Sequence, residues 1–219
     1  MAVGNFLLLT QIAGYAASTI LSLCVLIPLI VNLRDMKGNC LLYTSGIFLD
    51  TGDFVPKWAS SGYCTYTTVL SCQLNLVSLI QLTRMSYFLR RGVDSSFISA
   101  FWDTIVALLS VIFTILAAIF VTGGFSKWCR AVTQRFSSCE AGQGILSISS
   151  PDGVINTSNF SIQMGTVQFG IWTLFVTWVL LLVLAGRKLF IYHERENLIV
   201  SMSRDRRRYA AHGYNNLDK

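Results

Sequence analysis

Long apolar runs alternate with shorter polar segments along the chain. Four runs reach the length of about 20 residues that a helix needs to cross the hydrocarbon core of a bilayer. They cover residues 5–33, 66–89, 97–122 and 166–190, and the third run ends at the glycine pair Gly123-Gly124. The pattern predicts an all-α membrane protein in which residues 1–200 form a bundle of four transmembrane helices, followed by a basic tail over residues 201–219.

The composition favours a membrane protein over a soluble one. Of the 219 residues, 53% are hydrophobic and 13% are charged, whereas roughly 25% of the residues of a soluble domain are charged. A cleavable signal peptide is the alternative for the first run. No basic residue precedes that run, and it is longer than the apolar core of about 7–15 residues found in such peptides. We therefore expect the run to be a retained span.

With four spans, the polar segments 34–65 and 123–165 lie across the membrane from both termini. The second segment contains the glycosylation acceptors Asn156 and Asn159, which have a meaning only outside the cytosol. Eleven of the 17 Lys and Arg residues lie on the side of the termini, which the positive-inside rule assigns to the cytoplasm. Arg34 and Lys37 favour the opposite orientation for the first run alone. We expect cytoplasmic termini, in the plasma membrane rather than the endoplasmic reticulum.

Six cysteines divide between the spans and the loops. Two of them, Cys24 and Cys72, fall inside apolar runs, where a buried thiol is expected. The other four fall two to a loop, in the compartment where disulfides persist: Cys40 and Cys64 in the first loop, Cys129 and Cys139 in the second. Four cysteines allow three pairings. We favour the pairing within each loop, and pairing between the loops stays open.

The two loops also contain β-forming residues. In the first loop, residues 41–49 and 61–68 are rich in such residues and predict a short hairpin, with Pro56 among the turn residues between them. In the second loop, residues 145–149 and 154–155 flank Pro151-Asp152-Gly153 and resemble another hairpin. We expect short hairpins in both disulfide-braced loops.

The second run carries polar residues at helical spacing. Thr67, Ser71, Asn75 and Ser78 follow one face of the predicted helix. Such a stripe does not tolerate lipid, so it points at other helices or at a water-filled path. We favour hydrogen bonds between helices, and a conducting or substrate-binding lining is the alternative.

An ion pair is expected where the second and third runs meet. The connection between them is so short that the two helices form an antiparallel hairpin. Arg84 and Asp103 are ten and nine residues from Asp94, which places them at similar depth. Because a buried aspartate is costly unless paired, Arg84 is the expected partner of Asp103. We favour a pair that fixes helix register, and a proton or ion relay is the alternative.

No motif in the sequence indicates catalysis. His193 and His212 both lie near the C-terminus without a second His or Cys at ligand spacing, so we expect neither a metal nor another cofactor. The net charge of +6 comes from residues beside the spans, which favours membrane lipid over nucleic acid. The candidate anionic-lipid contacts are Arg204, Arg206, Arg207 and Arg208. The tail that holds them either extends the fourth helix or is disordered.

Several segments in the same order resemble the transmembrane protein 179 family. They are Asn5-Phe6-Leu7 with Gln11, residues 37–46 (KGNCLLYTSG), Ser95-Ser96-Phe97 with Ala100-Phe101, Gly124-Phe125 with Trp128-Cys129, residues 138–140 (SCE) and residues 167–172 (VQFGIW). The resemblance implies a four-span membrane protein, neuronal in animals and without an established activity, so that no catalytic residues carry over. The general plan also resembles claudin-like tetraspan proteins, although the first loop lacks their Gly-Leu-Trp signature and their closely spaced cysteine pair.

These features favour a non-enzymatic protein that associates laterally with another integral membrane protein, as an accessory or scaffolding subunit of a channel or receptor. The first alternative is a self-assembling pore or transporter lined by Thr67, Ser71, Asn75 and Ser78. The second alternative is adhesion through the glycosylated loops. A homo-oligomer is left open in all three readings.

Overall fold

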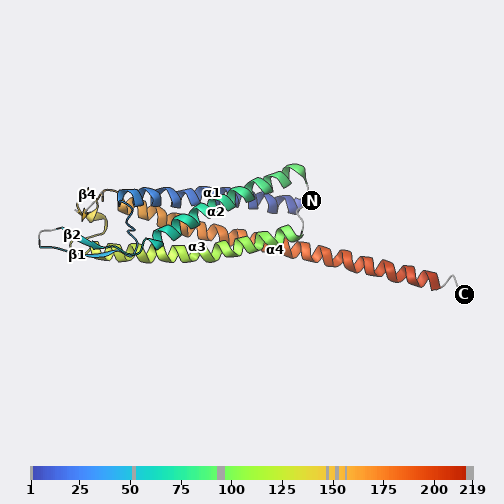
Figure 1. The fold of residues 1–219 in the computed structure, drawn as a ribbon. Helices are drawn as coiled ribbons and strands as arrows, with labels where there is room; N and C mark the ends of the chain where they lie inside the picture. The colour runs from blue at the N-terminus through green and yellow to red at the C-terminus, as the bar shows by residue number, and fades with distance from the viewer. Residues whose placement is uncertain are drawn as a thin grey trace.

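The computed structural model describes residues 2–50, 53–92, 97–146, 148–150, 153–155 and 157–215. Within these residues the chain forms four long helices, α1 (Ala2–Asp35), α2 (Gly62–Arg91), α3 (Phe97–Val132) and α4 (Phe160–Asn215). They run along a common axis as an elongated bundle (Figure 1). The predicted all-α bundle of four helices is therefore confirmed.

Three of the helices are long and apolar enough to cross a membrane, judged by length and composition over the described residues. The candidate spans are Phe6–Asp35, Phe97–Val132 and Phe160–Arg204, in α1, α3 and α4. Helix α2 has 30 residues, or about 45 Å of length, but it is not among them. The second predicted span, residues 66–89, is thus not among the candidate spans; it lies in α2, the most polar of the four helices, which packs against α1.

Close helix packing depends on small residues. A Cβ at Gly14 in α1 would lie 2.7 Å from Leu181 Cδ2, and one at Gly170 in α4 would lie 2.9 Å from Val25 Cγ2. The glycines therefore let α1 and α4 approach closely over much of their length, as small residues do between membrane helices.

Helix α3 continues past the point where the sequence predicted its end. It runs through Gly123-Gly124 to Val132, so the predicted loop start at residue 123 is wrong. The glycines instead allow the first loop to pack closely against α3, because a Cβ at Gly124 would lie 2.8 Å from Leu42 Cβ. The Gly124 carbonyl also accepts a hydrogen bond of 3.1 Å from the Tyr43 amide. The first loop is thereby laid directly on α3.

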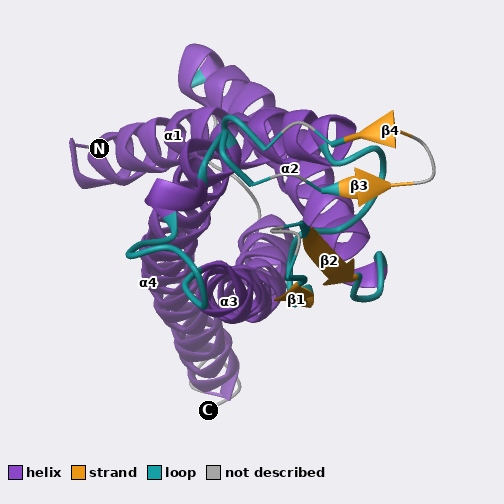
Figure 2. Cartoon of the chain, turned by 90° about the vertical axis from the view of Figure 1, so that its left-hand side faces the viewer, coloured by secondary structure: helices purple, strands orange, loops and turns teal. Residues whose placement is uncertain are grey.

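Two short hairpins lie at one end of the bundle (Figure 1), and Figure 2 shows the molecule from that end. Strands β1 (Ser45–Phe48) and β2 (Phe54–Lys57) pair antiparallel, and β3 (Ser149–Ser150) pairs with β4 (Gly153–Val154). The second hairpin agrees with its prediction. In the first hairpin the predicted partner strand, residues 61–68, is wrong because α2 begins at Gly62. Pro56, expected in a turn, lies within β2, where the strand is an edge and tolerates the missing amide donor.

Helix α4 extends far beyond the other helices. It projects from the end of the bundle where the N-terminus lies (Figure 1), and it reaches Asn215 as one helix. The fourth predicted span, 166–190, therefore lies inside a longer helix, and the predicted tail from residue 201 continues that helix. Arg204 lies 17 residues beyond Arg187, or about 25 Å along a straight helix.

Candidate functional site

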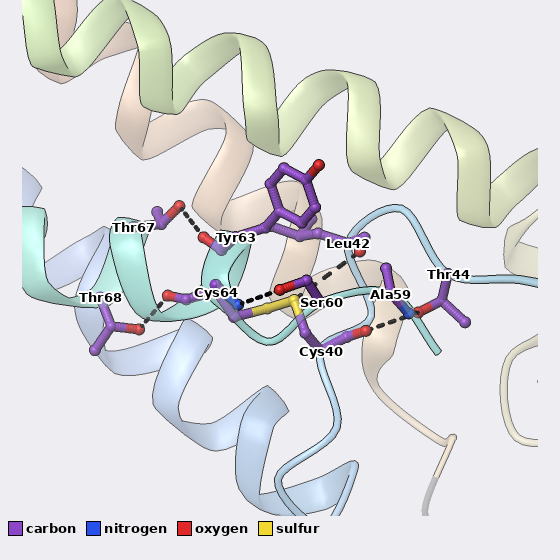
Figure 3. The surroundings of a disulfide bond; sticks show 10 residues. Cys40, Leu42, Thr44, Ala59, Ser60, Tyr63, Cys64, Thr67 and Thr68 are labelled. Carbon is purple, nitrogen blue, oxygen red and sulfur yellow. Dashed lines mark hydrogen bonds between the residues drawn. A yellow bond between two sulfur atoms is a disulfide. The ribbon is translucent and has the colours of Figure 1, made fainter. Parts of the chain in front are cut away.

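The hairpin end of the bundle is closed by a compact layer, which we call the cap. It comprises residues 36–61 and 133–159 in their described parts, and it rests on the ends of α1 to α4. The first loop is fixed by the Cys40–Cys64 disulfide, whose Cα atoms are 5.8 Å apart. Cys64 lies in the first turn of α2 and both sulfurs are buried (Figure 3). This bridge joins the loop covalently to the start of α2.

Hydrogen bonds support the same bridge. The Thr44 hydroxyl donates to the Cys40 carbonyl at 2.7 Å and accepts from the Ala59 amide at 3.3 Å. Thr44 is completely buried. Its hydroxyl therefore links the two ends of the loop beside the disulfide, as Figure 3 shows.

The second loop is held by the Cys129–Cys139 disulfide, with Cα atoms 5.0 Å apart. Cys129 is near the end of α3, and Cys139 directly precedes the short 3-10 helix η1 (Glu140–Gly142). Both cysteine pairs thus close within one loop, the pairing that the sequence favoured. Pairing between the loops is not found.

Aromatic side chains unite the two loops beneath the disulfides. The buried Trp128 of α3 makes edge contacts with Phe54 of β2 and Phe160 of α4, at centroid distances of 5.6 and 5.8 Å. Phe48 of β1 contacts Phe54 at 5.0 Å. The first loop and the start of α4 therefore pack on one tryptophan, and Phe48 contacts Phe136 of the second loop at 6.0 Å, so the cap and the helix ends share a single core.

The exposed side of the first hairpin, β1 with β2, carries apolar residues. Ile47 and Val55 are opposite each other across the two strands, and they are 66% and 47% exposed. Leu49 directly follows β1 and is 48% exposed. We call these three residues the hairpin patch. Neighbouring exposed apolar side chains on a paired hairpin make this surface a candidate contact with another molecule.

The predicted glycosylation sites lie in the second loop. Asn159 is exposed and directly precedes α4, where its carbonyl accepts the Gln163 amide at 3.0 Å. Asn156 lies outside the described residues. Thr157, between the two, is buried and donates to the Leu146 carbonyl at 2.9 Å. The side chain of Asn159 is therefore accessible, and its glycosylation stays a prediction.

The polar face of α2 is turned toward α1. Ser78 Oγ lies 2.8 Å from Ser18 Oγ, and Asn75 Nδ2 donates to Ser22 Oγ at 2.9 Å. Thr67 and Ser71 are buried and donate to carbonyls of their own helix. The stripe that the sequence identified thus carries hydrogen bonds between α1 and α2, the reading that was favoured over a conducting path.

Arg84 and Asp103 meet near the end of the bundle opposite the cap. Arg84 Nη2 lies 2.5 Å from Asp103 Oδ1, and Gln81 Nε2 donates to the same oxygen at 3.0 Å. The Asp103 side chain is 1% exposed, whereas that of Arg84 is 33% exposed. Arg84 also donates to Ser99 Oγ at 3.1 Å. The carboxylate is therefore buried with a cation whose far side reaches the surface, an arrangement suited to holding α2 and α3 in register.

A polar network between α1 and α4 is present that the sequence analysis does not predict. Gln163 accepts a hydrogen bond from Asn32 Nδ2 at 2.8 Å and donates to Asp35 Oδ2 at 2.7 Å. Asn32 and Asp35 are spaced for one helix face, which is the signal that was available. Their partner was missed because Gln163 was assigned to a loop rather than to the first turn of α4.

The basic cluster on α4 lies apart from these contacts. Arg204 and Arg206 are exposed, and the side chains of Arg207 and Arg208 lie outside the described part. On a straight α4 they lie about 25 Å or more along the helix axis beyond Arg187. The candidate span in α4 extends to Arg204, and the contact of these arginines with an anionic bilayer stays a prediction.

No catalytic or metal-binding arrangement is present among the described residues. No group of three or more His, Cys, Asp or Glu side chains there is placed to hold a metal ion. His193 is exposed and bonds to Asn197 on the same helix at 3.2 Å. Among the described residues, the candidate binding surfaces are therefore the exposed hairpin patch and the outer faces of the helices.

A family model described as "Transmembrane protein 179/179B Claudin domain" matches residues 7–210. The match includes α2, α3, most of α1 and α4, and both disulfides, and it extends the resemblance seen in the sequence into the projecting part of α4. No solved structure shows a significant match to the chain.

Proposed function

The chain belongs to the transmembrane protein 179/179B family and is a claudin-like multi-pass membrane protein, and on this premise we propose that it is a non-enzymatic accessory subunit of a channel or receptor. The proposal places the cap outside the cell, both termini in the cytoplasm and the protein in the plasma membrane. The cap then contacts the outer part of the partner while the bundle lies beside it in the bilayer.

The hairpin patch carries this proposal. Ile47, Leu49 and Val55 are exposed on a hairpin whose other residues are anchored on Trp128 and by the Cys40–Cys64 bridge. A rigid apolar surface loses little conformational freedom on binding, so most of its burial free energy remains available for affinity. Such a surface favours a stable protein partner over transient collision.

The alternatives fit the side chains less well. A pore lined by α2 needs Asn75 and Ser78 to face a path, whereas both bond to α1. Adhesion between cells needs a surface that reaches across a gap, whereas the cap is laid closely on the helix ends through Gly124 and Leu42. Lateral association requires neither feature.

Proximity labelling in cells that express the protein naturally tests the proposal. Ile47→Asp combined with Val55→Asp places two charges on the hairpin patch, and we expect one channel or receptor to lose most of its labelling. Ile145→Asp is the matched control because Ile145 is 70% exposed but lies in the second loop. Equal labelling in the patch variant and the control, with normal surface expression of both, contradicts the proposal.

A further inference from the structure

Helix α2 has a face that no described residue covers. It packs on α1 along its polar side, and it packs much less extensively on α3. Near the cap, Tyr66 contacts Phe120 at 5.7 Å, and at the far end Arg84 pairs with Asp103. Between these contacts the remaining side of α2 is exposed.

This α2 outer face has a regular composition. Its exposed residues recur every three or four positions and are Thr65, Val69, Cys72, Gln73, Leu76, Leu79, Ile80 and Thr83. Lipid is an adequate neighbour for most of them. It is a poor neighbour for Gln73, because an amide without a hydrogen-bond partner is costly to place in hydrocarbon.

Gln73 makes no hydrogen bond to another described residue, and it lies well inside the bilayer if α2 spans it. It is seven residues from the start of the predicted span at residue 66, or about 10 Å along the helix. Asn75 at this depth of α2 is bonded to α1, and Ser71 donates to the Thr67 carbonyl of its own helix. Gln73 is therefore the group on this face that requires an external partner.

We propose that the α2 outer face binds a second copy of this chain, with Gln73 bonded to Gln73 of the other copy. A two-fold interface sets each residue near the axis opposite its own equivalent. A side-chain amide is both donor and acceptor, so two copies of Gln73 satisfy each other. This self-complementarity selects a second copy over lipid, which offers no donor at this depth.

The proposal goes beyond the accessory function and uses another surface. The hairpin patch is on the cap, whereas Gln73 is on the side of the bundle. Loss of one contact leaves the other intact, so the two proposals fail separately. Purified full-length protein in phosphatidylcholine vesicles suffices for the test, because no other protein is required.

Cross-linking at the native Cys72 tests the geometry. Cys72 is exposed beside Gln73, whereas the other free cysteine, Cys24, is half-buried. Copper-phenanthroline oxidation is expected to give a disulfide-linked dimer that survives Cys24→Ser and disappears with Cys72→Ser. Val176→Cys in the double-serine background is the control, because Val176 is exposed on α4. Cross-linking of Val176→Cys at the same rate, or none through Cys72, overturns the proposal.

The strength of association tests the role of Gln73. Gln73→Leu keeps the size of the side chain and removes the amide, and we expect dimer dissociation constants about 3- to 30-fold higher by fluorescence transfer during lipid dilution. Thr83→Val is the control, because the Thr83 hydroxyl already donates to the Ile80 carbonyl at 2.9 Å. An unchanged constant for Gln73→Leu overturns the proposal. So does native-membrane cross-linking of Cys72 to a different protein with none between copies.

Discussion

The two ends of the bundle are held together by different physical means. At the cap, two disulfides and a buried tryptophan join loops to helix ends. At the opposite end, Arg84, Gln81 and Asp103 join α2 to α3 by charge and hydrogen bonds. Loops of this length bury too little apolar surface to fold alone, so the cap relies on cross-links and on Trp128. The opposite end consists of helices, whose backbone bonds are already satisfied, and needs only their register fixed.

Removing the disulfides should break the cap with the largest effect. Cys40→Ser removes a bridge with a sequence separation of 24, and Cys129→Ser removes one with a separation of 10. The entropy gained by the unfolded chain therefore predicts that the free energy of unfolding falls by about 3.5 and about 2.7 kcal/mol, respectively. Thermal unfolding in mild detergent measures both. Cys24→Ser, which removes a free thiol, is the control and should change little. A larger loss for Cys129→Ser than for Cys40→Ser would show that the first loop relies on its packing rather than on its bridge.

Exchanging the charges should affect the opposite end less. Arg84→Asp or Asp103→Arg alone sets like charges together near a buried position, and we expect a loss of about 1.5–3 kcal/mol for either one. The double exchange restores attraction and should recover part of that stability. Surface expression and thermal unfolding of the three variants measure the recovery. If the double variant is as unstable as the sum of the two single variants, the pair does not set the register of α2 and α3.

The features that follow from local pattern were predictable from the sequence. The apolar runs predicted the positions of the helices. The similar distances of Arg84 and Asp103 from Asp94 in the sequence predicted their ion pair. The pairing of cysteines followed from loop closure, because each pair is near in the chain. In each case the contact depends on short sequence separation or on a period that one segment displays by itself.

The features that were missed depend on distant contacts. Gly123-Gly124 has the same local signal whether it ends a helix or admits a neighbour, and only the approach of Leu42 decides between them. Residues 61–68 suit a strand, but they form the start of α2, where Cys64 is bridged to Cys40. The bond from Gln163 to Asp35 crosses 128 positions. No local pattern specifies a partner at that distance.

The smallest loss of stability is expected for a variant in the middle of the bundle, where Ser78 and Ser18 form a hydrogen bond. Ser78→Ala removes one hydrogen bond between membrane helices, which costs about 0.6 kcal/mol on average because the unfolded helix finds other partners in the membrane. Unfolding in detergent, compared with Thr68→Ala, measures it, since the Thr68 hydroxyl donates only to the Cys64 carbonyl of its own helix at 2.8 Å. A loss above about 2 kcal/mol for Ser78→Ala alone would mean that the middle of the bundle, rather than the cap, depends most on a single polar contact.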